Sequence, residues 1–346
     1  MPTAQQRAAE EVVAAVRKAF GRESALVLGA GGSLAAVEMV VPTGLPVLDR
    51  WVLPGGLPVG RMVELFGGEG AGKSSLVASA LAATQKMGGI AIVADTEYSL
   101  SPERVALFGV DLDSLVLLQP GHLSELFAQA QAAITAAHAI TKGKRPILFA
   151  WDSIAMTPSA HEVEEGLGGT AVPGERARAM SLNCPILARV AAETNTCLLF
   201  VNQIRMKIGV MYGNPETTPG GHAVKHFSSV RLQIRRGKAI KEGKADHIGM
   251  YVSVTSLKNK HVPPFRKCRA ELVYATGWAN AWSVLDHAKD RAVVPPATKL
   301  DALSLGKAIQ ALGWDDGPTP LDPAALLAQE YVPSATAVLE DEGEEE

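Results

Sequence analysis

Residues 67–74 read GGEGAGKS and fit the phosphate-loop pattern G-x-x-x-x-G-K-[ST]. Glycines in such a loop allow backbone N–H groups to curl around phosphate oxygens, and a helix that starts directly after the loop adds a positive field. Lys73 is expected to bridge the β- and γ-phosphates of ATP, and the Ser74 hydroxyl is expected to bind Mg²⁺. An apolar run precedes the motif and a helical stretch follows it, which is the context that the motif requires. The sequence therefore predicts a nucleotide site.

Two acidic residues follow apolar runs that are typical of strands. Asp152 ends the run 147–152 (ILFAWD), as the Walker B position requires, and is expected to hold Mg²⁺ through water. The alternative for Asp152 is a helix cap. Glu97 follows the run 90–95 and is a candidate to polarise the attacking water, because that role needs a carboxylate beside the γ-phosphate. Taken alone, Glu97 is more typical of a surface glutamate.

Strand-like and helical stretches alternate between about residue 60 and residue 235. The expected strands are Arg61–Phe66, Ile90–Asp95, Leu115–Gln119, Ile147–Asp152, Cys197–Asn202 and Val230–Arg235. The expected helices between the first five are Leu76–Lys86, Ser124–Ala139 and Ala177–Glu193. Buried strands joined by crossover helices predict an α/β fold, with a largely parallel sheet flanked by helices. The acids and the phosphate loop then share the carboxyl edge of that sheet.

The two ends of the chain differ from this core. Residues 4–20 carry apolar side chains at helical spacing, and a glycine-rich connector follows, so we expect an amphipathic helix that packs on its own domain or on a neighbour. We predict an N-terminal helix and linker at 1–33, a core at 34–280, a small C-terminal module at 281–333 and a disordered acidic tail at 334–346.

Composition limits the class of protein. The net charge is −3, of which residues 340–346 carry −6, so that the rest of the chain carries +3. Residues 205–269 contain 14 Lys and Arg against three acids. Such blocks favour a polyanion-binding body with an acidic tail, although a solvated basic face explains the charge equally well. No apolar run approaches the roughly 20 residues that span a bilayer, and three cysteines without metal-ligand spacing favour a cytoplasmic protein.

Three stretches closely resemble the bacterial and phage RecA recombinase family. They read GGLPVGRMVELFGGEGAGKSS, DTEYSLSPERVALFGVDLDSLVLLQP and NQIRMKIGVMYGNPETTPGGHAVKHFSSVRLQIRR, and the resemblance extends from about residue 43 to residue 280. Residues 4–27 also resemble the family's N-terminal helix, which packs on the adjacent protomer. The resemblance implies a RecA-type P-loop ATPase core that uses ATP and Mg²⁺.

The resemblance assigns roles around the nucleotide. The implied nucleotide-binding residues are Gly67, Gly68, Glu69, Gly70, Ala71, Gly72, Lys73, Ser74, Ser75, Arg104 and Asp152, with Ser74 and Asp152 on Mg²⁺. Glu97 matches the catalytic glutamate, and Gln203 matches the glutamine that senses the γ-phosphate. Lys258 and Lys260 match paired lysines that reach the γ-phosphate of a neighbouring protomer, although by themselves they form an ordinary basic turn. Arg104 and Ser101 replace the family's adenine-holding tyrosine and aspartate, so the base pocket is altered.

The resemblance also implies two DNA-binding loops. Residues 204–218 match the second loop, in which cations neutralise phosphates and an apolar wedge, here Ile208, enters between bases. Residues 161–174 occupy the place of the first loop but depart from its usual sequence. The implied DNA-binding residues are Arg178, Ser181, Arg205, Lys207, Ile208, Gly220 and Gly221.

The function implied by the resemblance is ATP-dependent filament formation on single-stranded DNA, with homologous pairing to double-stranded DNA and strand exchange. The implied partners are both forms of DNA and further copies of the chain in a helical filament, without a membrane. An alternative is a filament that acts mainly as a DNA-damage regulator by stimulating self-cleavage of a LexA-type repressor. A ring-shaped motor of the same fold is a third possibility, against which the N-terminal helix, the 204–218 loop and the lysine pair argue.

Overall fold

The computed structural model describes residues 2–21, 24–30, 36–167, 172, 174–206, 216–243, 246–315 and 320–328. Its internal contacts divide the chain into two units, Met1–Glu38 and Met39–Glu346. The sequence-based domain boundaries at 33/34, 280/281 and 333/334 stay predictions. No helix in the described ranges is both long and apolar enough to cross a bilayer.

The first unit contains helix α1 (Ala4–Phe20), as predicted from the spacing of its apolar residues. Thr3 and Gln6 form a capping box, in which each side chain bonds the other's backbone N–H, so the helix start is fixed locally. Within α1, Val12 and Phe20 are exposed. The helix therefore forms from its own capping and periodicity.

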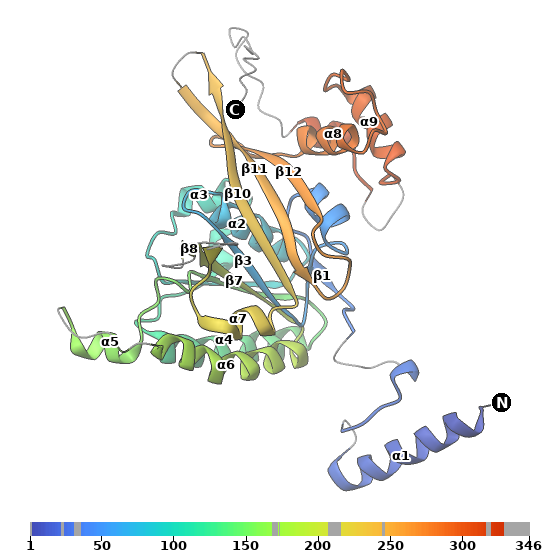
Figure 1. Ribbon diagram of the computed structural model, residues 1–346, viewed down its shortest axis with the longest axis vertical. Coiled ribbons are helices and arrows are strands. Elements are labelled where there is room, and N and C mark those ends of the chain that lie inside the picture. Colours follow the sequence, from blue (N-terminus) through green and yellow to red (C-terminus); the bar gives the residue numbers. More distant parts are fainter. Residues whose placement is uncertain are drawn as a thin grey trace. The chain divides into compact units, whose positions relative to one another are not determined.

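A nine-stranded sheet organises the second unit (Figure 1). Its order is β13 (Gly277–Ala279), β12 (Lys267–Val273), β11 (Asp246–Asn259), β10 (Val230–Glu242), β3 (Met62–Gly67), β7 (Thr196–Gln203), β6 (Ile147–Asp152), β4 (Ile90–Asp95) and β5 (Val116–Leu118). The strands from β10 to β5 are parallel, and β11 to β13 are antiparallel additions. The predicted α/β fold with a largely parallel sheet is confirmed.

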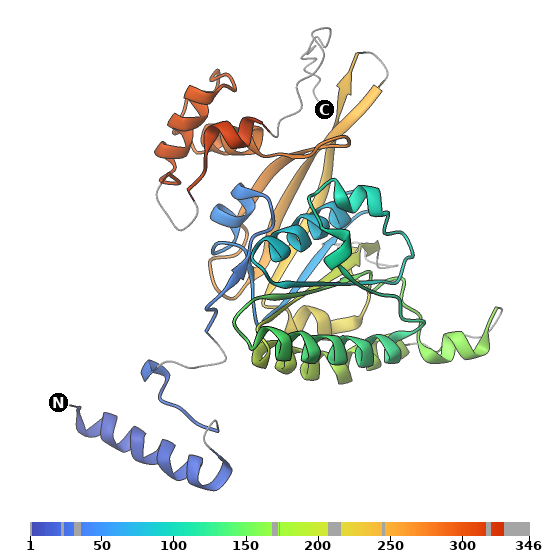
Figure 2. The same ribbon diagram turned by 180° about the vertical axis from the view of Figure 1, so that it is seen from behind.

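Helices cover both faces of the sheet and form two apolar layers. One face packs against α2 (Lys73–Lys86) and α3 (Pro102–Ala106), and the other packs against α4 (Leu123–Thr141), α6 (Glu175–Glu193) and α7 (Gly221–Phe227). Figure 2 shows α4 and α6 side by side. Trp151 on β6 is fully buried between Phe127 and Phe200, with its ring edge-on to both. These ring contacts join α4, β6 and β7 in one apolar layer.

Strands β10 and β11 form a long hairpin that extends past the other strands (Figure 1). Beyond β12, helices α8 (Asn280–Asp290), α9 (Ala302–Ala311) and α10 (Pro323–Leu327) follow. Val284, Leu305 and Leu326 from these helices join the same apolar cluster as α2. The helices after β13 are thus continuous with the main core rather than set apart from it.

A buried carboxylate lies in the second unit away from the phosphate loop. Asp49 belongs to the helical turn η2 (Leu48–Val52), is 7% exposed, and accepts bonds from Thr43 N at 2.9 and 3.1 Å. Burial raises its pKa from 3.8 to about 7, although the bonds from Thr43 and the charge of Arg50 act in the opposite direction. The folded protein therefore binds this proton more tightly than the unfolded chain does.

We expect Asp49 to make stability fall as the pH rises from about 4 to about 7. A carboxyl whose pKa is higher in the folded state favours folding below the unfolded pKa and loses that contribution as it ionises. Between pH 5 and pH 8 the loss is about 2–3 kcal/mol, at about 1.4 kcal/mol per pKa unit. Urea unfolding of the wild type and of Asp49→Asn at several pH values measures it. The free energy of unfolding of Asp49→Asn should depend less on pH than that of the wild type. An equal pH dependence in the two proteins would contradict the assignment.

Candidate functional site

The phosphate loop joins the end of β3 to the start of α2, as the motif predicts. Gly72 caps α2 with φ +91°, and a Cβ on Gly72 would lie 3.2 Å from Leu272 and 3.5 Å from Trp278. A Cβ on Gly67 would lie 2.2 Å from the carbonyl oxygen of Ile234. Glycine is thus required at both positions because neighbouring strands and side chains approach the loop closely.

Lys73, the first residue of α2, is folded back over the loop. Its Nζ donates to the carbonyl oxygens of Gly67 at 3.2 Å and Gly68 at 2.7 Å. Burial lowers the pKa of Lys73, while the negative charges of Asp152, Glu97 and Glu69 raise it. The ammonium group therefore lies above the loop that would hold phosphates, surrounded by acids.

Ser74 and Asp152 are brought together from α2 and β6. The Ser74 hydroxyl donates to Asp152 Oδ2 at 2.8 Å. Burial raises the pKa of Asp152 to about 6, and the charges of Glu97 and Asp95 add to this rise, whereas Ser74 and Lys73 oppose it. A hydroxyl and a carboxylate at hydrogen-bonding distance are hard oxygen donors of the kind that Mg²⁺ prefers, so these residues fit the predicted metal ligands.

Glu97 lies where three strands end. Its Oε1 accepts from Ser153 Oγ at 2.5 Å and from Gln203 Nε2 at 3.2 Å, so the carboxyl ends of β4, β6 and β7 meet at this carboxylate. Asp95 shapes the turn that presents Glu97, because its carboxylate accepts from the backbone N–H of Glu97, Ser99 and Leu100. The structure thus connects the predicted catalytic glutamate directly to the predicted phosphate sensor.

A cavity of about 360 Å³ lies against the phosphate loop. Arg104 and Ser101 line it as expected, from α3 and the residue that caps it. Phe108, Arg236 and Tyr274 also line it, and sequence reasoning did not identify them. Only the fold could reveal them, since they come from the turn after α3, the long hairpin and the turn after β12. The cavity offers a place for a base beside the phosphate site.

Residues of the second predicted DNA loop begin directly after Gln203. Arg205 lies exposed on the short strand β8 (Arg205–Met206), which pairs with β9 (Glu216–Thr217). Lys207 and Ile208 lie outside the described residues. Gly220 and Gly221 begin α7 with φ +90° and +71°, and a Cβ on Gly221 would lie 2.9 Å from Ala177 of α6. Gly221 therefore also has a packing reason to be glycine.

The residues predicted to contact DNA near the first loop lie on α6. Arg178 and Ser181 are exposed, and Ser181 Oγ donates to Ala177 O at 2.8 Å. Of the stretch 161–174, residues 168–171 and 173 lie outside the described residues. Helix α5 (Ala160–Glu165) occupies its start and is capped by Ser159 and Glu162. The exposed start of α6 and the β8–β9 hairpin are the described parts of the candidate DNA surface.

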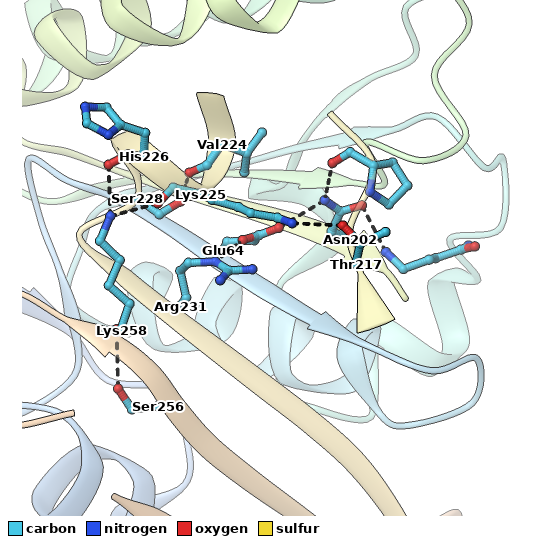
Figure 3. Close-up of polar contacts among 12 residues, drawn as sticks. Glu64, Asn202, Thr217, Val224, Lys225, His226, Ser228, Arg231, Ser256 and Lys258 are labelled. Carbon is cyan, nitrogen blue, oxygen red and sulfur yellow. Dashed lines mark hydrogen bonds and ion pairs between the residues drawn. The ribbon is translucent and has the colours of Figure 1, made fainter. Parts of the chain in front are cut away.

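Lys258 and Lys260 lie at the opposite end of the sheet from the phosphate loop. Lys258 of β11 pairs with Arg231 of β10, which in turn pairs with Glu64 of β3. Gly67, where the phosphate loop begins, pairs with Ile234, which lies further along β10. Lys258 Nζ donates to the carbonyl oxygens of Lys225 at 2.7 Å and His226 at 2.9 Å (Figure 3). Burial lowers its pKa, as do the neighbouring cations. Lys258 is therefore three residues along β10 from the level of Gly67, toward the end where the parallel strands β3 and β10 begin.

Replacing Lys73 with alanine should weaken nucleotide binding about 10- to 150-fold, because a hydrogen bond to a charged group contributes about 1.5–3 kcal/mol. Titration with a fluorescent nucleotide measures this. Lys86→Ala, at the other end of α2, is the matched control. Unchanged affinity in the Lys73 variant would remove the phosphate-loop assignment.

Comparison with known proteins agrees with this geometry. The family model described as the RecA N-terminal domain matches residues 7–279. Protein RecA of Ruminococcus albus is 37% identical over 289 residues, covering 84% of this chain and 70% of that protein. Protein RecA of Heliobacterium modesticaldum is 38% identical over 288 residues, covering 83% and 80% respectively. Protein RecA of Chlamydia muridarum is 37% identical over 289 residues, covering 84% and 79%. The chain therefore belongs to the RecA family, the DNA-dependent ATPases of homologous recombination and repair.

Proposed function

We propose that this chain assembles with ATP and Mg²⁺ into a helical filament on single-stranded DNA, pairs that strand with homologous double-stranded DNA, and exchanges strands. The observation that carries the proposal is the bond between Gln203 Nε2 and Glu97 Oε1. It connects Gln203, which begins the proposed DNA loop, to Glu97, the proposed catalytic acid. A change at the γ-phosphate thereby reaches the proposed DNA loop through the side chain of Gln203.

At the nucleotide, each residue has a role that its contacts support. The backbone of residues 67–75 surrounds the phosphates, Lys73 neutralises their charge, and Ser74 and Asp152 are the residues to hold Mg²⁺. The metal, when bound, neutralises charge that develops on the phosphate oxygens. Glu97 accepts the proton of the attacking water, and Ser153 and Gln203 fix its carboxylate in place.

The DNA surface combines exposed cations with the loop that joins β7 to α7. Arg178 and Arg205 are the described cations of this surface, and the proposal adds Lys207 as a phosphate contact and Ile208 as the wedge between bases. Cations neutralise backbone phosphates without reading sequence, so homology is tested by base pairing itself. We place this activity in the cytoplasm.

Assembly supplies the remaining cations. Lys258 and Lys260 lie at the sheet end opposite to their own phosphate loop, which suits a contact with the nucleotide of an adjoining copy rather than with their own. A head-to-tail contact whose rotation does not close a ring repeats along an axis and produces the helical filament of this proposal. Hydrolysis then depends on polymerisation.

The rate of ATP hydrolysis with and without single-stranded DNA tests the proposal. The expected result is a rate that rises when DNA is added and that rises further with protein concentration. A control with Lys73→Ala shows whether the measured rate belongs to this site. A rate that does not respond to DNA, in a protein that sedimentation shows to be monomeric with nucleotide and oligonucleotide present, would contradict the proposal.

A further inference from the structure

A buried polar group beneath α7 has no role in the site as described so far. Glu64, in the middle of β3, and Asn202, near the end of β7, are both fully buried, and Arg231 of β10 is 16% exposed. All three lie on the sheet face that α7 covers, the same face to which Met62 and Phe200 contribute apolar side chains. Buried polar groups are costly unless they are paired, so their pairing shows what they hold together.

The pairing of Asn202 uses every polar atom of its amide. Nδ2 donates to Glu64 Oε1 at 3.1 Å and to the carbonyl oxygen of Pro219 at 2.9 Å, and Oδ1 accepts from the backbone N–H of Gln203 at 3.0 Å. Glu64 in turn accepts from Arg231 Nε at 2.5 Å, and the Arg231 guanidinium lies 4.7 Å over the ring of Phe66. Figure 3 shows this group between β3, β7 and β10.

These bonds join the two ends of one loop. The chain leaves β7 at Gln203 and returns at Pro219, immediately before Gly220 and α7. Asn202 bonds both points, and its bond to Glu64 fixes them to the central strand that leads into the phosphate loop. On the return side, Lys225 Nζ adds a bond to Thr217 Oγ1 at 2.9 Å. The span between the fixed points is the candidate DNA loop.

The chemistry at this position requires an amide. Two of its neighbours, the Glu64 carboxylate and the Pro219 carbonyl, can only accept hydrogen bonds, while the Gln203 N–H can only donate. Asparagine supplies two donors and one acceptor in that arrangement. Aspartate has the same shape but would lose both donors and place a second carboxylate against Glu64. The position therefore requires the two donors and one acceptor of the asparagine amide, and not only a side chain of that volume.

We propose that Asn202 is a positioning residue that couples nucleotide to DNA, because it holds both ends of the 204–218 loop against β3 so that movement of Gln203 at one end is passed to Pro219 at the other. This inference rests on the proposed function. Gln203 bonds Glu97 at the nucleotide through its side chain and bonds Asn202 through its backbone. A shift of Gln203 toward a γ-phosphate therefore pulls on the amide that also fixes Pro219. Without that amide, Pro219 would no longer be linked to Gln203 and would not shift with it.

The test compares DNA affinity in two nucleotide states. Single-stranded DNA binding by full-length protein is measured with a slowly hydrolysed ATP analogue and with ADP, for the wild type, Asn202→Ala and Asn195→Gly. Asn195 lies at the other end of the same strand, bonds Gly143 O at 2.8 Å, and has φ +52°, which glycine retains. We expect the ratio of the two affinities to fall in Asn202→Ala to within about twofold of one, and to keep its wild-type value in Asn195→Gly.

The effect of DNA on nucleotide affinity provides a second measurement, which a loss of stability alone would not change. Coupling free energy is mutual, so the effect of DNA on nucleotide affinity must fall by the same factor as the effect of nucleotide on DNA affinity. Asn202→Asp is expected to lose the coupling as fully as alanine does, although it conserves shape. Melting curves set a temperature at which each variant is folded.

The outcomes separate the two proposals. A wild-type ratio near one overturns the proposed function and this inference with it. A high wild-type ratio that Asn202→Ala retains overturns this inference alone. If Asn202→Ala does not fold, Asn202→Ser takes its place, since its single hydroxyl proton can be donated to Glu64 or to Pro219 but not to both. If neither variant folds, Asn202 is a residue of the fold only, and the inference is wrong.

Discussion

Replacing Lys258 with alanine is expected to lower the rate of DNA-stimulated ATP hydrolysis by about 10³- to 10⁵-fold, by analogy with an arginine supplied to a phosphoryl group by a neighbouring protein. In the chain described here this lysine donates to two carbonyls at the end of α7 and lies at the sheet end away from its own phosphate loop. The rate is measured at protein concentrations where the variant still sediments with DNA. Lys267→Ala, an exposed lysine on the neighbouring strand, is the control.

The second large effect is expected at Glu97. Glu97→Gln conserves the length of the side chain and an oxygen that can accept from Ser153 and Gln203, but it removes the group that takes a proton from water. Loss of a general base typically costs about 10²- to 10⁴-fold in rate. ATP binding and DNA-bound filaments should remain, as fluorescence titration and electron microscopy can show. Undiminished hydrolysis would remove Glu97 from the catalytic role.

Mixing the two variants tests whether the lysine acts within its own chain or on its neighbour. In a filament of equal parts, a Lys258→Ala protomer beside a Glu97→Gln protomer has its own intact acid and its neighbour's intact lysine. About a quarter of the sites then become complete, if the contact between protomers is head-to-tail and mixing is random. Recovery of activity supports action on the neighbour. No recovery, with mixed filaments shown to form, would place both residues in one site of one chain.

Most strands of the fold could be predicted from apolar runs, because a parallel sheet covered on both faces leaves long buried stretches in the sequence. β4 and β6 begin and end where their runs predict. β10 was expected to end at Arg235 but continues to Glu242, since this part of the hairpin lies past the other strands and buries no apolar face. β11 was not predicted, although Met250, Val252 and Val254 alternate with more exposed residues, as in a strand buried on one face.

The residues of the site likewise divide into those that the sequence could predict and those that it could not. Lys73, Ser74 and Asp152 could be predicted because a motif or the end of a strand fixes their positions. Ser153 and Asn202 could not, although each stands next to a predicted residue, because their roles depend on side chains that other strands bring within bonding distance. Tyr274 depends wholly on the antiparallel strands, which place a late segment of the chain beside the cavity. Local sequence contains no sign of such an approach.

The separation of the lysine pair from its own phosphate loop along the sheet has a consequence for any polymer of this chain. If Lys258 and Lys260 act on the neighbour as proposed, the two ends of that polymer differ: the nucleotide site at one end receives no lysines from a neighbour, and the lysines at the other end have no neighbouring nucleotide to reach. A row of protomers thus always contains one competent site fewer than it has members. Specific activity should therefore climb steeply over the shortest assemblies and level off in long ones, and turnover at the two tips should differ.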